Sequence, residues 1–526
     1  MNKKLLLILF GISGMTALIY EIIWIRPLSL VFGTTTYAVS IIVASFILGL
    51  AIGSWFAGKF TDRLENPLKY FALIQIAVGF FGILLLPVFE LLPGLYLNLY
   101  HLTYPNQSIF FITQILMSIA MITIPATLMG TTLPLMMKIY SKEITTVGKD
   151  VGRLDASNSV GAFFGTLAAG FLIIPILGIH DGILVTASIN IIMGSIILIT
   201  KKYLNLKYVS VIIIVLIPLL IFYPSYDEKY LAGGVFRSPV DLTLEMYSEN
   251  IESYNLLYYK ESLYQNVMVQ SFGADLKVLK LDGNPQCNTR DLTASGLINL
   301  VQVPFQLYLT NYEQPQTGLN IGLACGITSF VMSKNLNTTT IEIDPAVVEA
   351  SKFFFDSIDH RLIIDDARNW LLRNNEKFDI ITSEPTDPWM SWNMHTKEYF
   401  EILSNHVTEK GVVAQWIPVY ELQDKNFLIM YNTFHSVFPY VYVYSMESGL
   451  TGQLIFVGSQ YELKIEKSAG YFFNQDDVQD VKTEFNTDNK PIIEFATANS
   501  LYDRSTQSIE FPFNNEEIYE KFNALN

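Results

Sequence analysis

The chain has 526 residues, which is long enough for two or more domains. Hydrophobic residues make up 51% of it, charged residues make up 16%, and the mean hydropathy is +0.32, a composition that is unusual for a wholly soluble enzyme. The net charge of −15 argues against a nucleic-acid partner, because such binding needs Lys and Arg to displace counterions. Two cysteines, Cys287 and Cys325, are too few for a disulfide framework, and a structural metal site built on cysteine is not expected.

Long apolar runs fill the first 225 residues. A helix needs about 20 apolar residues to cross the hydrocarbon core of a membrane. The predicted spans are 5–25, 34–57, 70–92, 109–137, 157–179, 181–200 and 207–223. The first run follows Lys3 and Lys4 and lacks a small-residue cleavage site, so we interpret it as a retained helix and not as a signal peptide.

The loops between these runs differ in their positive charge. Lys and Arg cluster at 3–4, 59–69, 138–153 and 201–207. The loops near 93–108 and 176–182 have none, so the amino terminus is predicted to lie in the cytoplasm. Seven spans would place the rest of the chain on the opposite side. A re-entrant segment, or a break of the 109–137 run near Pro125, would reverse this, and the side stays open.

Polar and small residues within the runs suggest helix contacts. Glu21 and Arg26, at the end of the first span, are predicted to pair near the interface. The stretch 48–63 resembles a loop signature of major-facilitator transporters, and its small residues would let helices approach closely. These small residues are Gly49, Gly53 and Gly58, and the stretch 161–170 is similar. We interpret both stretches as close packing without transport.

From about residue 255 the pattern changes to that of a globular domain. The stretches 264–272 and 276–283 alternate around a Gly-Ala-Asp turn, which predicts a β-hairpin. Strands then alternate with helices, which predicts a parallel sheet with right-handed crossovers. The predicted strands lie in 318–334, 338–344, 360–372, 378–385 and 411–420. The expected domains are a transmembrane helical bundle (1–225), a linker with the β-hairpin (226–290), a Rossmann-like domain (291–460) and an acidic tail (461–526).

Ligands of parallel sheets bind at the carboxyl ends of the strands. Gly322 and Gly326 follow the first of these strands and would let the backbone approach a ligand. Glu342 ends the second strand, where an acid can accept hydrogen bonds from both ribose hydroxyls. Asp366 ends the third, where it can accept from an adenine amino group. Together they predict a nucleoside site; the competing interpretation is that these acids only cap the following helices.

The order of several short motifs completes this pattern. The motifs are Tyr264-Gln265-Asn266, Leu281-Asp282-Gly283, the glycine loop, Glu342-Ile343-Asp344, Asp366-Ala367-Arg368 and Glu384-Pro385-Thr386-Asp387-Pro388. This order resembles the spermidine synthase (polyamine aminopropyltransferase) family, and more closely its membrane-fused branch, in which a helical bundle precedes the synthase domain. The resemblance implies a small β-hairpin domain and a Rossmann-like parallel sheet of the S-adenosylmethionine-dependent transferase type after the bundle.

The resemblance also implies roles for individual residues. The residues implied for the nucleoside of the co-substrate are Gln265, Gly322, Gly326, Glu342, Asp366 and Ala367. Glu384 would be the general base, and Asp387 is the acid of the Asp-Pro pair that follows it. The implied reaction transfers an aminopropyl group from decarboxylated S-adenosylmethionine to an amine such as putrescine. No metal is expected, since a sulfonium is already a good leaving group. The expected partners are the amine and the lipid bilayer; a homo-oligomer stays open.

Three departures from the family pattern keep other functions open. Cys325 stands where the family has an Asp that meets the ammonium group of the donor, and Glu384 stands where it has Asp. After Asp291 the sequence is apolar, where the family has acidic and aromatic residues that bind polyamine. The alternatives are an S-adenosylmethionine-dependent methyl or alkyl transferase with a membrane acceptor, and a non-enzymatic, transporter-like protein that senses nucleosides.

Overall fold

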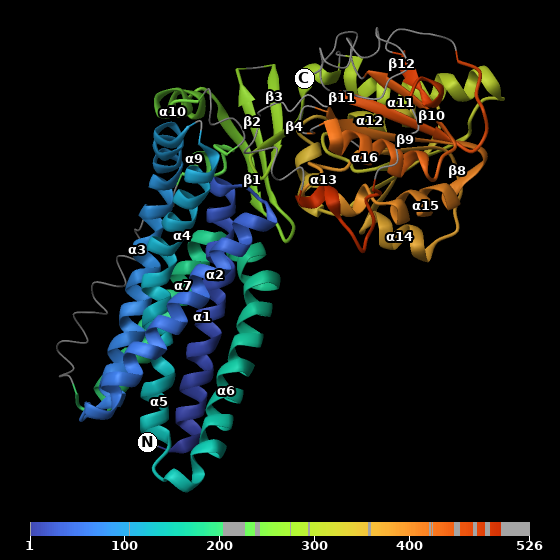
Figure 1. The fold of residues 1–526 in the computed structure, drawn as a ribbon. Helices are drawn as coiled ribbons and strands as arrows, with labels where there is room; N and C mark the ends of the chain where they lie inside the picture. The colour runs from blue at the N-terminus through green and yellow to red at the C-terminus, as the bar shows by residue number, and fades with distance from the viewer. Residues whose placement is uncertain are drawn as a thin grey trace. The chain divides into compact units, whose positions relative to one another are not determined.

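The structure is a computed structural model (Figure 1). It describes residues 2–104, 106–203, 227–236, 242–273, 275–292, 295–355, 359–419, 422, 424–445, 453–465, 471–478 and 484–495. The chain divides into two compact units. The first comprises Met1–Ser253 with Lys260–Asn266, and the second comprises Tyr254–Tyr259 with Val267–Asn526.

The first unit is a bundle of long helices. They are α1 (Lys3–Phe32), α2 (Thr36–Phe60), α3 (Pro67–Thr103), α4 (Gln107–Gly130), α5 (Thr132–Tyr140), α6 (Val147–Ala168) and α7 (Ile174–Thr200), followed by the short α9 (Glu228–Leu231) and α10 (Leu244–Glu252). In the described residues, five helical stretches are long and apolar enough to span a membrane. These stretches are Lys3–Phe32, Thr36–Arg63, Pro67–Thr103, Ser108–Tyr140 and Ile144–Thr200.

The last stretch contains two of the predicted spans, 157–179 and 181–200. It is interrupted at Gly178, whose φ of 76° is not helical, so the chain turns between the two spans. The fourth run breaks at Thr131, between α4 and α5, and Pro125 lies inside α4. The predicted span 207–223 falls outside the described residues.

Close packing of the helices follows from glycine, as the sequence predicts. A Cβ at Gly53 would lie 2.0 Å from the Thr127 carbonyl oxygen, and a Cβ at Gly161 would lie 1.8 Å from that of Gly11. These contacts join α2 to α4 and α6 to α1. Gly58, by contrast, has no atom within 4 Å of its Cβ position, so its predicted role in packing is wrong.

The predicted pairing of Arg26 with Glu21 is also wrong. The Arg26 guanidinium donates hydrogen bonds to the carbonyl oxygens of Leu263, at 2.7 Å, and Ser262, at 3.3 Å. Both acceptors belong to the segment Lys260–Asn266 of the same unit. Arg26 therefore ties this later segment to the end of α1.

A small antiparallel sheet contains the predicted hairpin. Its strands, in spatial order, are β1 (Asn255–Glu261), β2 (Asn266–Phe272), β3 (Leu276–Leu281) and β4 (Asn284–Asn288). Phe272 pairs with Leu276 and Val267 pairs with Leu281, which confirms the hairpin.

The large sheet of the second unit has the order β12-β10-β11-β9-β8-β5-β6-β7. Its strands are β5 (Thr317–Ile321), β6 (Asn337–Glu342), β7 (Arg361–Ile364), β8 (Phe378–Ser383), β9 (Val407–Pro418), β10 (Tyr440–Ser445), β11 (Gln453–Ser459) and β12 (Tyr471–Asn474). β5 to β9 correspond to the five predicted strands and run parallel to one another. The sheet also has a part that was not predicted, because β10, β11 and β12 are antiparallel to their neighbours and β12 lies past residue 460.

Helices cover both faces of this sheet. The helices are α11 (Ser295–Asn311), α12 (Ile327–Ser333), α13 (Pro345–Ser351), α14 (Ala367–Arg373), α15 (Lys397–His406) and α16 (Asp424–His435). Successive strand residues point to opposite faces, so Ile380 packs in the core with α11 and α12, while Ile381 packs in the core with α14, α15 and α16. This three-layer arrangement leaves the carboxyl ends of the parallel strands as the place for a site.

Candidate active site

Four neighbouring parallel strands end at the same edge of the large sheet. Across β8, β5, β6 and β7 the paired residues near this edge are Ser383 with Ile321, Ile321 with Ile341, and Glu342 with Ile364. Glu384, Gly322, Glu342 and Asp366 therefore lie in or directly after adjacent strand ends. The order in which the chain presents these residues differs from their order in space, since β8 is the neighbour of β5.

The glycine loop between β5 and α12 has a backbone that few residues other than glycine adopt. Gly322 has φ +93°, and a Cβ there would lie 2.8 Å from the Glu384 carbonyl oxygen. Ala324 also has positive φ, at 46°, and Gly326 has φ +88° at the start of α12. Glycine is thus required at 322 by both conformation and close approach.

Glu342 holds this loop in place. Its Oε2 accepts a hydrogen bond from the Leu323 N–H and its Oε1 accepts one from the Asp344 N–H, each at 2.9 Å. Burial raises the pKa of Glu342 to about 7, although both N–H groups act to lower it. Each carboxylate oxygen has a second lone pair, so the same side chain can accept further hydrogen bonds from a diol.

The acids that follow β6 and β7 act partly as helix caps. Asp344 Oδ1 accepts from the Ala346 N–H at 2.9 Å and caps α13. Asp366 Oδ1 accepts from the Asn369 N–H at 2.7 Å and caps α14, of which Ala367 is the first residue. The competing interpretation of the sequence therefore describes a real contact of Asp366, and the role of Asp366 in nucleoside binding stays a prediction.

Glu384 is the most unusual group at this edge. Its Oε1 is buried and has no hydrogen-bond partner among the described residues. Burial raises the pKa of Glu384 to about 8, and the Thr328 hydroxyl opposes this rise. A carboxylate oxygen that is buried without a hydrogen-bond partner is costly in folding free energy, and acids with perturbed pKa values concentrate at functional sites. With a pKa near neutrality it suits proton transfer.

Asp387 is held by a residue that the sequence did not identify. Both of its carboxylate oxygens lie 2.6 Å from Asn284 Nδ2, and both residues are buried. Asn284 begins β4, directly after the Leu281-Asp282-Gly283 motif, and that position was the only sequence signal for it. The contact joins the small sheet to the loop that carries the two candidate catalytic acids.

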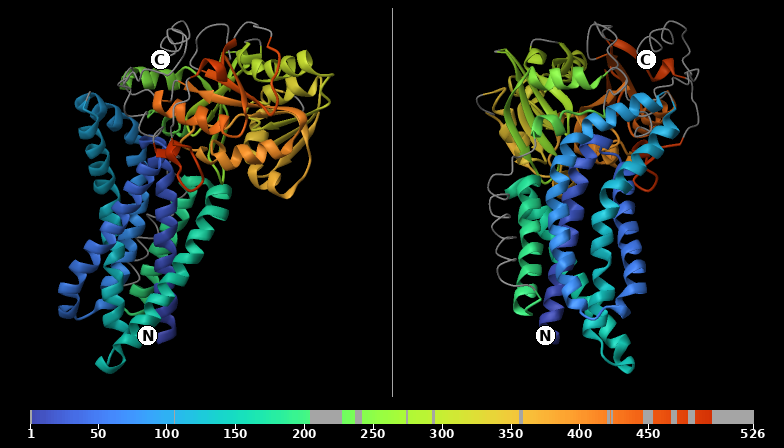
Figure 2. Two further views of the ribbon diagram at one scale, coloured as in Figure 1. Left: turned by 45° about the vertical axis from the view of Figure 1, so that its right-hand side comes forward. Right: turned by 90° about the vertical axis from the view of Figure 1, so that its left-hand side faces the viewer.

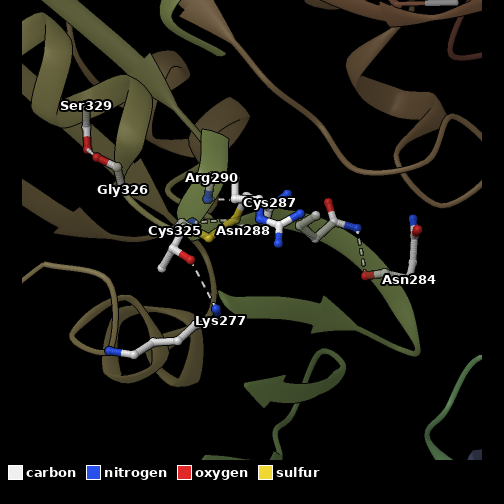
Figure 3. Close-up of a disulfide and its surroundings, with 10 residues drawn as sticks. Lys277, Asn284, Cys287, Asn288, Arg290, Cys325, Gly326 and Ser329 are labelled. Atoms are coloured by element: carbon white, nitrogen blue, oxygen red, sulfur yellow. Dashed lines mark hydrogen bonds between the residues drawn. A yellow bond between two sulfur atoms is a disulfide. The ribbon is translucent and has the colours of Figure 1, made fainter. Parts of the chain in front are cut away.

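A disulfide bond makes a second link between the small sheet and this edge (Figure 3). Cys287 of β4 is bonded to Cys325 of the glycine loop, and the Cys325 N–H donates to Cys287 Sγ at 3.1 Å. The cysteine count excluded a framework of several bonds but gave no sign of this single one. Both cysteines are buried. Cys325 thus offers no ionisable thiol to a ligand.

Gln265, the remaining predicted site residue, lies in the first compact unit. It closes a turn in which the Ser262 N–H donates to the Gln265 carbonyl at 2.9 Å and the Gln265 N–H donates to Ser262 Oγ at 3.1 Å. Its role in nucleoside binding stays a prediction. In the part of the chain that the structure describes, no three His, Cys, Asp or Glu residues are grouped to hold a metal ion.

Residues 322–468 match the family described as the spermine/spermidine synthase domain. This range begins at Gly322 and includes Glu342, Asp366 and Glu384. The matched range lies entirely within the second unit, whose part of the chain is called the synthase domain below.

Two relatives of this chain are similar to it over a range much longer than residues 322–468. The polyamine aminopropyltransferase of Corynebacterium efficiens is 23% identical over 449 residues, which cover 80% of this chain and 79% of that protein. That of Oceanobacillus iheyensis is 22% identical over 423 residues, covering 77% of this chain and 75% of the relative. Matches of this length include part of the helical bundle, which fits the membrane-fused branch. The crystal structure of spermidine synthase from Thermotoga maritima covers 47% of this chain and 87% of its own, with 20% identity and a TM-score of 0.34.

Proposed function

We propose that this protein is a membrane-anchored polyamine aminopropyltransferase. It transfers an aminopropyl group from decarboxylated S-adenosylmethionine to an amine such as putrescine, and its apolar helices anchor it as a multi-pass membrane protein. The observation that carries the proposal is the Glu384 carboxylate, whose buried Oε1 has no hydrogen-bond partner among the described residues, at the same sheet edge as the glycine loop and Glu342.

The nucleoside part of the donor fits the groups at this edge. Gly322 lets the loop backbone adopt a φ of +93° and pass close to the Glu384 carbonyl oxygen, and in the proposal this loop lies against the ligand. Glu342, already fixed by two N–H groups, accepts hydrogen bonds from the ribose hydroxyls. Asp366 and Ala367 border the adenine, and Gln265 contributes from the segment before β2.

The chemical step needs a base and a means of orientation. The nitrogen of the acceptor amine attacks the carbon next to the sulfonium, the carbon–sulfur bond breaks, and the sulfur leaves as a neutral thioether. Glu384 takes the proton that the amine loses. A positive charge nearby favours the ionised form of a carboxylate, so binding of the sulfonium lowers the pKa of Glu384 from about 8 and produces the base where it is needed. Asp387 attracts and aligns the cationic amine.

A second function is favoured by one specific observation. Cys325 is consumed in the disulfide, so no charged side chain stands at the position where the family meets the ammonium of the donor. A donor without that requirement, S-adenosylmethionine itself, would make the protein a methyl or alkyl transferase that acts on a membrane acceptor.

Product analysis of the purified full-length protein in detergent separates the two functions. With decarboxylated S-adenosylmethionine and putrescine, the proposal expects methylthioadenosine and spermidine. With S-adenosylmethionine and membrane lipids, the second function expects S-adenosylhomocysteine if the methyl group is transferred, or methylthioadenosine if the larger alkyl group is transferred. Calorimetry with both donors and methylthioadenosine gives the affinities, and tighter binding of the carboxylated donor would contradict the proposal.

Two variants test the role of Glu384. Glu384→Gln should bind methylthioadenosine with unchanged affinity and lose turnover by at least about 100-fold, the lower end of what a general base contributes. Glu409→Gln, at an exposed position of the same domain, is the matched control and should keep full turnover. Full turnover of Glu384→Gln would remove this residue as the base.

A further inference from the structure

The two ends of the helical bundle differ in charge, and the chain leaves for the synthase domain from only one of them. We infer that the synthase domain lies on the side of the membrane opposite the cytoplasm, and that the Cys287–Cys325 disulfide reflects an oxidising compartment. The contacts that carry this inference lie inside the first unit, with the disulfide of the second unit as an independent observation.

One end of the bundle is rich in Lys and Arg. Its basic residues are Lys3, Lys4, Lys59, Arg63, Lys69, Lys138, Lys142, Lys149, Arg153, Lys201 and Lys202. Lys138 Nζ, at the end of α5, donates to the carbonyl oxygens of Thr61 at 2.8 Å and Leu64 at 2.8 Å, which join the α2–α3 turn to α5. Lys3 donates to Asp150 of α6 at 3.5 Å. Figure 2 shows the amino terminus at the same end as the turn between α5 and α6.

The other end of the bundle binds the segments that lead into the second unit. Arg26 donates to the Leu263 carbonyl at 2.7 Å, and the Ile179 N–H donates to Glu261. His101 Nε2, near the end of α3, lies 3.0 Å from the Leu242 carbonyl. The turns 33–35, 104–106 and 178–180 at this end contain no Lys or Arg.

Helix length shows that these are opposite ends. α1 is a single helix of 30 residues, and Arg26 follows Lys3 by 23 positions, so at 1.5 Å per residue they are about 35 Å apart along the axis. Likewise His101 follows Lys69 by 32 positions in α3, about 48 Å. Each distance exceeds the thickness of the hydrocarbon core, about 30 Å.

Cytoplasmic loops carry an excess of Lys and Arg. The basic end therefore faces the cytoplasm, and residues 242–253 and 260–266 face away from it. These segments are joined by peptide bonds to Tyr254, Tyr259 and Val267 of the second unit. The conclusion does not depend on counting spans, so it holds without the predicted span 207–223. Among the described residues, the second end has Arg26, Lys229 and Lys260, which are too few to reverse the bias.

The disulfide is an independent argument for the same side. Disulfides persist in extracytoplasmic compartments and are rare in the cytosol, where thiols are kept reduced. Cys287 and Cys325 are both buried in the synthase domain and bonded to each other. If the proposed function holds, donor and acceptor must then be available on that outer side; the side of the domain itself does not depend on the activity.

Cysteine labelling of the full-length protein in spheroplasts of a Gram-negative host tests the inference. Glu409→Cys is exposed in the synthase domain, and Thr145→Cys is exposed in the turn between α5 and α6. A membrane-impermeant maleimide should label Glu409→Cys in intact spheroplasts and Thr145→Cys only after permeabilisation. The reverse pattern, or labelling of both before permeabilisation, overturns the assignment.

The disulfide is tested in the same cells after acid quenching. The wild-type protein should react with the maleimide only after reduction, whereas the Cys287→Ser variant should expose one reactive thiol in denaturant without reduction. Reaction of both wild-type thiols without a reductant overturns the oxidising-compartment part of the inference. The turnover of detergent-solubilised protein is measured separately, so failure of the proposed function is recognised independently of the labelling result.

Discussion

Replacement of Glu384 by Gln should remove activity and, at the same time, stabilise the protein. Burial raises the pKa of Glu384 from an ordinary 4.5 to about 8. Between these two pH values the unfolded chain releases the proton and the folded protein retains it. The unfolded state thus binds fewer protons, so the free energy of unfolding falls as pH rises through this range.

The magnitude follows from the pKa difference. One pKa unit corresponds to 1.36 kcal/mol. The buried acid therefore destabilises the wild-type protein by roughly 3 kcal/mol at pH 7, and by less than about 1 kcal/mol at pH 5. Gln keeps the shape of the side chain and has no charge to bury. The variant should be more stable than the wild type, with a difference that grows from pH 5 to a maximum above pH 8.

Urea unfolding of the full-length protein in detergent, followed by tryptophan fluorescence, measures this difference. Trp389 is buried in the loop that follows Glu384 and reports on the region. The midpoint difference between Glu384→Gln and the wild type is compared at pH 5, 7 and 8.5, with Glu409→Gln as the exposed control. Glu342, whose pKa is also raised, is present in both proteins and cancels. A midpoint difference that does not change with pH would refute the reasoning about Glu384.

Further predictions concern the supports of the site. Gly322→Ala should lower nucleoside affinity by at least about tenfold in calorimetry, because its Cβ would lie 2.8 Å from the Glu384 carbonyl oxygen at a φ of +93°; unchanged affinity would show that the loop tolerates a side chain. Asn284→Ala removes a hydrogen bond to the buried Asp387, which costs about 1–3 kcal/mol. The variant should lower kcat/KM for the acceptor amine about tenfold or more and leave the affinity for the aminopropyl donor unchanged. An equal loss for both substrates would argue against an acceptor site. Reduction of the disulfide, which closes a sequence separation of 38, should lower the free energy of unfolding by roughly 4 kcal/mol; an unchanged urea midpoint on reduction would contradict this. The value of kcat/KM should rise with pH up to about pH 8, because Glu384 ionises in the free enzyme over this range. A value of kcat/KM that stays constant from pH 6 to 9 would contradict the role of Glu384 as the base.

The sequence by itself determined the features that local patterns encode. The length of the apolar runs identified the helices of the bundle. The alternation of apolar and polar residues identified the hairpin, and the alternation of strands with helices identified the five parallel strands. Since parallel strands all present their carboxyl ends at one edge, the residues after each strand, among them Gly322, Glu342 and Glu384, were predicted to gather before any tertiary contact was known. The spacing of apolar residues along the chain suffices for such predictions, because residues close in sequence share the regular backbone geometry of one helix or strand.

Only the tertiary structure decided the contacts between distant parts of the chain. Asn284 and Asp387 are 103 residues apart, and Cys287 and Cys325 are 38 residues apart, so no local pattern relates them. The same holds for Arg26, whose partner is a carbonyl of Leu263 and not the nearby Glu21. Such contacts depend on which elements the fold places side by side, and a backbone carbonyl or a single cysteine carries no signal of its partner. The side of the membrane that the synthase domain faces is inferred from contacts of this kind.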